Sequence, residues 1–222
     1  AHMVFNTYAT AGGIHGTYIC TGTLLNDTTP GTQVPWFYSA DHCFAGGSDG
    51  VPVQDRAKVA LSLNTYWGYE NSVCGTNNGV RANPLTGGAD VMFHDANVDA
   101  LLLRLRNAPP ASATFAGWDA SPLAANASVI ALHHPSGDAK KYSRGQHVTD
   151  VYPENFTVGW QEGTTEGGSS GSGLFTLYRD NSYRLRGGLY GGSASCANAG
   201  NLSNAGNRDH YSRLDLVFPQ IK

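Results

Sequence analysis

A serine flanked by glycines is the first feature of the sequence that could support chemistry. The segment 166–175 reads EGGSSGSGLF, with Ser170 near its centre. Glycines allow positive φ and a close approach to a substrate, so such a loop can aim two backbone N–H groups at one point. An oxyanion would form at that point if the Ser170 hydroxyl attacked a carbonyl. Taken alone, the segment favours a simple turn, because glycine and serine are the usual turn residues. A nucleophile would need a base and an acid elsewhere in the chain.

His42 is the candidate base. It follows the predicted strand 36–39 and directly precedes Cys43. A disulfide between Cys20 and Cys43 would close a loop of about two dozen residues, worth roughly 3–3.5 kcal/mol. Such a bridge would fix the backbone that carries His42. The alternative is a surface or structural histidine, but the position beside a cysteine favours a functional one.

Asp99 is the candidate acid. It stands at the start of the apolar run 100–105, which reads ALLLRL and predicts a strand. A buried carboxylate needs partners because its desolvation is costly. An imidazole N–H is a natural partner and would hold the histidine tautomer that accepts a serine proton. A turn-capping Asp99 is the alternative. Asp90 and Asp95 compete for the role, but neither directly precedes so apolar a run.

The elements that would position these residues are strands. Glycine is frequent at 28 of 222 residues and charged residues make up only 14%. That composition, with many turn signals, is typical of an all-β protein. Residues 107–125 are rich in Ala, Pro and Ser and predict a connection between two halves, each suited to a small barrel. The expected strands are 17–25, 36–39, 59–67, 97–105, 127–134, 140–150, 155–160, 173–178, 183–190 and 210–218.

Composition also excludes several classes of protein. The formal net charge of −3 gives no sign of a nucleic-acid or membrane-binding surface. No apolar run approaches the roughly 20 residues of a membrane span. Residues 1–3 resemble a cloning remnant and are left out of the expected fold. Neither a metal nor a cofactor is expected.

The adjacent His133 and His134 at first suggest metal ligands. Neighbouring residues on a strand point to opposite faces, however, and a zinc site needs three or four converging ligands. Asp138, the only close carboxylate, lies across a Pro/Gly turn. A strand-to-turn junction is the favoured interpretation.

His42, Asp99 and Ser170, in that order, resemble the chymotrypsin-like serine proteases. The match is closest to the bacterial lysyl endopeptidases. The similar segments are 20–22, 69–74, 117–119, 130–135, 165–170, 191–196 and 207–211. This resemblance implies two six-stranded antiparallel Greek-key barrels, residues 4–110 carrying His42 and Asp99 and residues 111–222 carrying Ser170, with the active site in the crevice between them.

The resemblance also implies a mechanism. His42 would take the Ser170 proton as Ser170 attacks the scissile carbonyl, and Asp99 would orient His42 and stabilise its cation. The backbone N–H groups of Gly168 and Ser170 would form the oxyanion hole. Since Ser169 rather than Asp precedes Ser170, activation by an inserted N-terminus is not expected, whereas propeptide removal is typical of the family.

Substrate choice would depend on an aspartate near the end of the sequence. Trypsin-like enzymes place Asp six residues before the nucleophile, where this chain has Thr164. Lysyl endopeptidases instead use an Asp that matches Asp209, and a carboxylate there would favour a cationic residue on the amino side of the scissile bond, the P1 residue. The alternative for Asp209 is a loop cap beside Arg208. The edge formed by Gly191, Gly192 and Ser193 could pair with a substrate backbone.

Two departures from the family bear on this pocket. Tyr190 stands where the family has His, and residues 148–156 lack the family's Trp, so cleavage after Arg as well as Lys is an open alternative. Glutamyl specificity, to which His210 could contribute, is another. A catalytically silent binding protein on the same scaffold is the third.

The resemblance further implies a secreted monomer that acts on polypeptides. In the family, cysteines of an N-terminal stretch pair with the counterparts of Cys74 and Cys196. Those partners are missing here. Cys74 and Cys196 therefore either bond each other or are free, because a bridge needs Cα atoms within about 7 Å.

Overall fold

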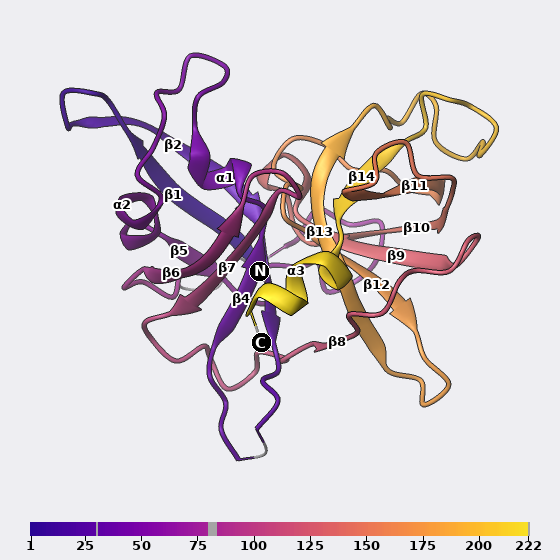
Figure 1. Cartoon of the computed structure of the whole chain (residues 1–222), viewed down its shortest axis with the longest axis horizontal. Coiled ribbons are helices and arrows are strands. Elements are labelled where there is room, and N and C mark those ends of the chain that lie inside the picture. Colours follow the sequence, from indigo (N-terminus) through magenta and orange to yellow (C-terminus); the bar gives the residue numbers. More distant parts are fainter. Residues whose placement is uncertain (30, 80–83, 222) are drawn as a thin grey trace.

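The strands of the N-terminal half form two antiparallel sheets. The computed structural model describes residues 1–29, 31–79 and 84–221, and Figure 1 shows two lobes of strands, one from each half of the chain. The first sheet has the order β2-β1-β5 and the second β3-β4-β7-β6. Their strands are β1 (His2–Tyr8), β2 (Ile14–Thr21), β3 (Thr23–Leu25), β4 (Trp36–Ser39), β5 (Asn64–Tyr66), β6 (Ala89–Asp95) and β7 (Ala100–Leu105).

The strands of the C-terminal half close into a barrel. Six of them follow the order β12-β9-β10-β11-β14-β13, and a pairing between β12 and β13 closes the ring, while β8 joins β13 in parallel. The strands are β8 (Gly117–Trp118), β9 (Ser128–His133), β10 (Lys141–His147), β11 (Asn155–Glu162), β12 (Gly173–Leu177), β13 (Tyr183–Gly192) and β14 (Asp209–Ser212). The predicted all-β class is confirmed. Among the described strands only this half forms a closed six-stranded barrel, since the first half divides its hydrogen bonds between two sheets.

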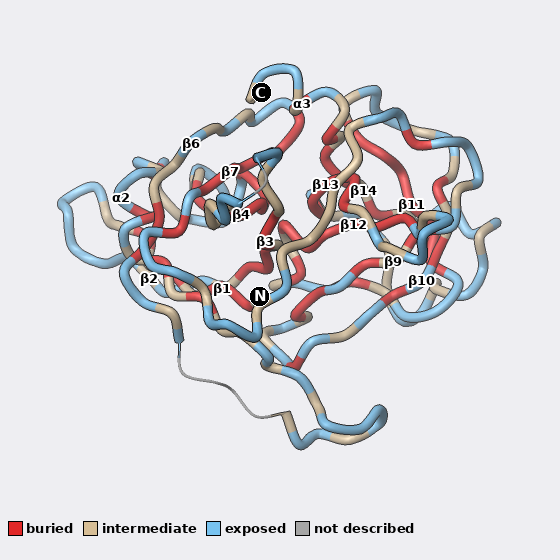
Figure 2. The backbone as a smooth tube through the Cα atoms, turned by 90° about the horizontal axis from the view of Figure 1, so that it is seen from below, coloured by how far each residue is buried: buried red, intermediate tan, exposed pale blue. Residues whose placement is uncertain are grey.

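Three clusters of buried side chains hold the fold together. One lies within the N-terminal lobe and another within the C-terminal barrel. A third joins the two lobes, where Tyr38 and Leu102 pack with Phe175, Leu185 and Leu214. Figure 2 shows the buried residues running along the strands of both lobes, with the loops exposed. The domain boundary at residue 110 remains a prediction.

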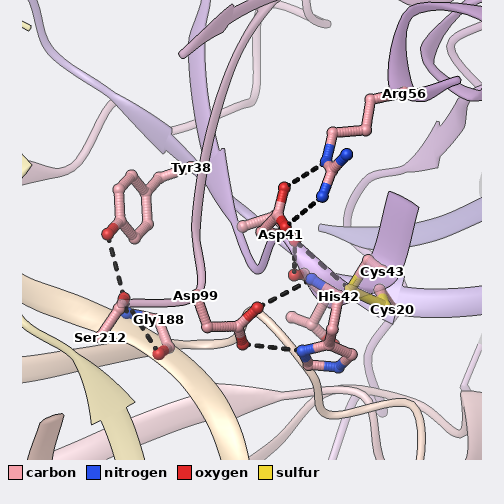
Figure 3. A network of polar contacts seen from close by, with 11 residues as sticks. Cys20, Tyr38, Asp41, His42, Cys43, Arg56, Asp99, Gly188 and Ser212 are labelled. Atoms are coloured by element: carbon pink, nitrogen blue, oxygen red, sulfur yellow. Dashed lines mark hydrogen bonds and ion pairs between the residues drawn. A yellow bond between two sulfur atoms is a disulfide. The ribbon is translucent and has the colours of Figure 1, made fainter. Parts of the chain in front are cut away.

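A buried hydrogen bond also crosses between the lobes. The hydroxyls of Tyr38 and Ser212 lie 3.0 Å apart, and Ser212 Oγ accepts the N–H of Gly188 at 2.9 Å (Figure 3). Burial raises the pKa of Tyr38 well above its ordinary value. The phenol therefore stays neutral and serves as a fixed link between β4 and the barrel.

Three sequence predictions are wrong in detail. Residues 1–3 belong to the fold: Met3 in β1 is fully buried and pairs with Cys20 and Thr65. The predicted strand 59–67 begins instead as helix α2 (Arg56–Leu61), because Asp55 caps it by accepting the Ala57 N–H at 3.0 Å. Each error reflects a local signal that was overlooked or discounted.

The chain ends in a helix rather than in the predicted strand 210–218. Strand β14 stops at Ser212, and helix α3 (Leu214–Ile221) follows at the junction of the lobes (Figure 1). Leu214 and Val217 are buried at a spacing of three residues, which places both on one face of a helix, whereas residues three apart on a strand point to opposite faces. The remaining helices are α1 (His42–Ala45) and the 3₁₀ turn η1 (Pro135–Gly137).

Candidate active site

His42 and Asp99 form a two-point contact. Asp99 Oδ2 lies 2.7 Å from His42 Nδ1, and Asp99 Oδ1 accepts the His42 backbone N–H at 2.8 Å (Figure 3). The carboxylate is 5% exposed and the imidazole 38%. The acid is thus desolvated and held against Nδ1, while the imidazole as a whole is partly exposed.

The alternative acids have other partners. Asp90 pairs with Arg104 and Arg106 on the surface, and Asp95 accepts the Asn97 N–H. Asp41, directly before His42, is buried but makes a bidentate pair with Arg56 (Figure 3). Of these acids, Asp99 is the one on the His42 ring.

The backbone at both residues is constrained. Cys20 and Cys43 form the predicted disulfide, which is thereby confirmed, and it anchors α1 directly beside His42. Asp99 has a φ of 56°, a left-handed conformation that non-glycine residues adopt rarely. Strained backbone of this kind persists where the surrounding structure dictates it, often at functional sites.

The loop that carries Ser170 leaves several N–H groups unused. The N–H of Ser169 donates to Glu166 O and that of Gly171 to Leu189 O. Within the part of the chain that the structure describes, the N–H groups of Gly167, Gly168 and Ser170 donate to no protein acceptor. Those of Gly168 and Ser170 alternate with the paired groups of Ser169 and Gly171, so they are available to a ligand.

Thr21 fastens this loop to the N-terminal lobe. Its N–H donates to Ser170 O at 2.8 Å, and its hydroxyl donates to Gly168 O at 3.0 Å while accepting the His134 N–H. Thr21 follows Cys20 of the disulfide, so Ser170 and His42 are fixed to the same part of the molecule. No hydrogen bond joins Ser170 Oγ to His42 Nε2 among the described residues. Thr21 could not be identified from the sequence, because only tertiary packing brings it to this loop.

Replacing Gly171 by Ala should disrupt the loop. Gly171 has a φ of 77°, and a Cβ there would lie 2.1 Å from Ser39 Oγ and 2.6 Å from Thr21 O. We expect a loss of about 3 kcal/mol in the free energy of unfolding, measured by urea denaturation. Gly167→Ala is the matched control, since a Cβ at Gly167 would have no neighbour within 4 Å. Equal stability of the two variants would contradict this account of the loop.

Asp209 is buried at the start of β14 rather than exposed as a loop cap. Its Oδ2 accepts Trp160 Nε1–H at 2.6 Å and the Thr165 hydroxyl at 2.7 Å. Its Oδ1 accepts no hydrogen bond from the described residues and lies where a Cβ on Gly192 would come within 2.4 Å. One carboxylate oxygen is therefore fixed by the protein, and the other faces the glycine edge.

Other predicted pocket residues have different roles. Thr165 rather than Thr164 contacts Asp209, and the Thr164 hydroxyl is buried without a hydrogen-bond partner among the described residues. Arg208 does not pair with Asp209, because its guanidinium donates to backbone carbonyls, including those of Leu202 and Asn204. Trp160 and Thr165 were missed, since nothing in the sequence pairs them with Asp209.

The predicted substrate edge lies beside these groups. Gly192 pairs with Asp209 and Gly191 with His210 across β13 and β14. The Ser193 hydroxyl turns away to donate to Gly206 O. The exposed Tyr190 ring meets the His42 ring edge to face, with centroids 5.9 Å apart. This edge therefore runs from the acid at Asp209 to the imidazole of His42.

His133 and His134 lie at a strand-to-turn junction, as predicted. His133 ends β9 and contacts Ser169 and Ser143, whereas His134 Nδ1 lies 3.0 Å from Asp138 O and its ring stacks on Tyr69. The two rings do not converge on a common point. Burial lowers the pKa of His133 to about 4 and that of His134 further.

Acid should therefore destabilise the fold. His133 is neutral when folded but takes up a proton near pH 6.5 when unfolded, so its contribution is complete above that pH and falls as the pH drops toward 4. We expect this group alone to lower the free energy of unfolding by about 2 kcal/mol between pH 7 and pH 5. Urea titrations at both pH values measure this, and His133→Asn should show a smaller difference. An identical pH dependence in the variant would contradict the prediction.

Comparison with known proteins places the chain in a family. A model of the C-terminal domain of lysyl endopeptidase matches residues 1–212. The chain belongs to the lysyl endopeptidase family. Lysyl endopeptidase of Pseudomonas aeruginosa is 41% identical over 230 aligned residues, which cover the whole chain and 46% of that protein. The chain thus spans less than half the length of this curated relative.

Solved structures share the fold. The active form of the Rv3671c protease of M. tuberculosis matches with a TM-score of 0.60 and 17% identity, over 99% of this chain and 78% of that one. Its inactive form matches with a TM-score of 0.54 and 15% identity, over 99% and 86%. At such identities the likeness shows the protease fold alone.

Two further sequence predictions concern the remaining cysteines and Tyr190. Cys74 and Cys196 are free, exposed thiols, which decides between the two alternatives left open by the sequence. Tyr190, which the sequence suggests in place of a family histidine, contacts His42. Among the described residues, no helix is both long and apolar enough to cross a membrane.

Proposed function

We propose that this chain is a serine endopeptidase that cleaves peptide bonds through Ser170, His42 and Asp99. The observation that carries the proposal is the desolvated Asp99 carboxylate on His42 Nδ1, while Nε2 of the partly exposed ring has no hydrogen-bond partner among the described residues. A carboxylate at Nδ1 keeps the proton there, so that Nε2 is free to accept another.

The reaction would begin at Ser170. His42 Nε2 takes the Ser170 proton while Oγ attacks the scissile carbonyl, and the imidazolium then donates that proton to the leaving amine. Asp99 stabilises the cation between the two steps. Catalytic hydrogen bonds often tighten only when substrate is bound, so a direct contact of Ser170 with His42 belongs to the complex.

The unused N–H groups of Gly168 and Ser170 suit the oxyanion. Each would donate to the negative oxygen of the tetrahedral intermediate. One such donor typically stabilises the transition state by about 2.7–4 kcal/mol. Thr21 supports this role, because it holds the carbonyls of both residues and so orients the peptide units around them.

Asp209 would select a cationic P1 side chain. Its free Oδ1, beside the Gly192 edge, offers an acceptor to an ammonium group, and the Trp160 and Thr165 bonds hold the carboxylate in place. We propose Lys as the preferred residue. His210 stands next to Asp209 on a strand and so faces the other way, toward Thr157 and Tyr152. A glutamyl pocket built on His210 has less support for that reason.

We further propose a secreted monomer that acts on polypeptides. The Cys20–Cys43 disulfide favours an oxidising compartment.

A phosphonate probe tests the nucleophile. A diphenyl phosphonate with a lysine-like side chain should label the wild-type protein once, on Ser170, as identified by mass spectrometry. Ser170→Ala should remain unlabelled, whereas Ser203→Ala, in an exposed loop, should label like wild type. A wild-type protein that is folded but unreactive would favour the silent binding protein instead.

A further inference from the structure

A buried chain of hydrogen bonds lies behind the Ser170 loop, and the proposed mechanism does not use it. His133 Nδ1 lies 2.9 Å from Ser169 Oγ, and His133 Nε2 lies 3.0 Å from Ser143 Oγ. The chain continues at both ends into the backbone, to Thr164 O at 3.0 Å and to Glu166 N at 3.3 Å. The side chains of Ser169, His133 and Ser143 are at most 1% exposed.

Only one assignment of donors and acceptors fits these hydrogen bonds. A carbonyl oxygen only accepts, so the Ser143 hydroxyl donates to Thr164 O. Ser143 must then accept from His133 Nε2–H, which leaves Nδ1 as an acceptor for the Ser169 hydroxyl. Ser169 Oγ in turn accepts the Glu166 N–H. Every polar atom is satisfied when His133 is neutral, with its proton on Nε2.

These hydrogen bonds connect the proposed oxyanion hole with the proposed Asp209 pocket. Ser169 lies between Gly168 and Ser170, whose N–H groups donate to no acceptor among the described residues. Thr164 and Glu166 flank Thr165, which contacts Asp209. His133 on β9 and Ser143 on β10 thus tie one loop segment, 163–170, to two strands of the barrel.

The sequence of this segment fits such a close attachment. Gly163 has a φ of 70°, and a Cβ there would lie 2.7 Å from Ser143 Oγ. Ser169 stands where a trypsin-like enzyme has the Asp that pairs with an inserted N-terminus. A neutral serine can be held from within the barrel instead, by a buried imidazole that needs no counter-ion.

We propose that His133 is a positioning residue: it holds Ser169 through Nδ1 and so aims the Gly168 and Ser170 N–H groups at the oxyanion. This inference rests on the proposed function. A misaligned oxyanion hole weakens transition-state binding more than substrate binding. Loss of the hydrogen bonds through His133 should therefore lower kcat and leave KM nearly unchanged.

Variants at both ends of the bond test the proposal. We expect Ser169→Ala and His133→Leu to lower kcat on a lysyl amide about 100-fold, with KM within about threefold of wild type. His133→Asn can still accept from Ser169 and should keep kcat within about tenfold. His147→Asn, a buried histidine of the same barrel bonded to Ala124 O and Asp150, should lose stability but not kcat.

If these variants fail to fold, a spectroscopic measurement on the wild-type protein still tests the proposal. In ¹⁵N-histidine NMR spectra of the wild-type protein, assigned with the help of His133→Asn, His133 should be neutral with Nε2 protonated at pH 7. The opposite tautomer or a charged ring would overturn the proposal, as would a folded Ser169→Ala with wild-type kcat. If the wild-type protein reacts with no phosphonate, the proposed function fails, whereas the NMR result still reports on the His133 chain.

Discussion

Asp99→Asn should lower kcat about 10⁴-fold while leaving the fold intact. The His42 backbone N–H can only donate, so the amide oxygen of the variant side chain would take the place of Oδ1, and its NH₂ group would face Nδ1. An NH₂ group there forces Nδ1 to accept and places the ring proton on Nε2. His42 could then no longer take the Ser170 proton.

Steady-state cleavage of a lysyl amide, with urea denaturation as a check of folding, measures this effect. Asp95→Asn is the control, since Asp95 accepts the Asn97 N–H at the surface, and this variant should keep full activity. A loss smaller than about tenfold in a folded Asp99→Asn protein would show that Asp99 does not orient the base.

Asp209→Asn should abolish the preference for Lys. Trp160 and Thr165 both donate to Oδ2, so the amide oxygen of the variant side chain would keep these bonds and its NH₂ group would take the place of Oδ1. A donor would then face the substrate ammonium. Loss of one partner of a buried charge pair costs about 2–5 kcal/mol, so we expect kcat/KM for Lys substrates to fall about 10²–10³-fold.

Matched peptides with Lys, Arg or norleucine at P1 measure this change. The norleucine peptide should be cleaved about equally by the two proteins, because its side chain carries no charge. Asp180→Asn, at an exposed surface ion pair with Arg184, is the control and should retain the preference. Undiminished cleavage after Lys by Asp209→Asn would exclude Asp209 as the specificity residue.

Features fixed by short sequence segments were predictable. The Cys20–Cys43 bridge and the all-β class follow from residue types and spacing, and the structure confirms both. The contact between His42 and Asp99 was inferred from a lone acid before an apolar strand, and the two side chains do meet. Desolvation explains the success, because a buried acid must have a partner.

Features that depend on register across strands were not predictable. Trp160 and Thr165 reach Asp209 from elements about 50 residues earlier, and Thr21 reaches Gly168 from the other lobe. Helices α2 and α3 were missed because one or two turns carry too little periodicity to distinguish them from strands. The His133 chain likewise depends on how β9 and β10 pack under the loop.

A cleavage map tests the serine endopeptidase assignment most directly. An unfolded protein mixture is digested with the wild-type chain and with Ser170→Ala, and the new termini are identified by mass spectrometry. We predict cuts on the carboxyl side of Lys that are absent with the variant. Additional cuts after Arg would mean that the pocket beside Tyr190 accepts both cations, and cuts after Glu would indicate a glutamyl pocket. Cuts that persist with Ser170→Ala, or none from a folded wild-type protein, would contradict the assignment.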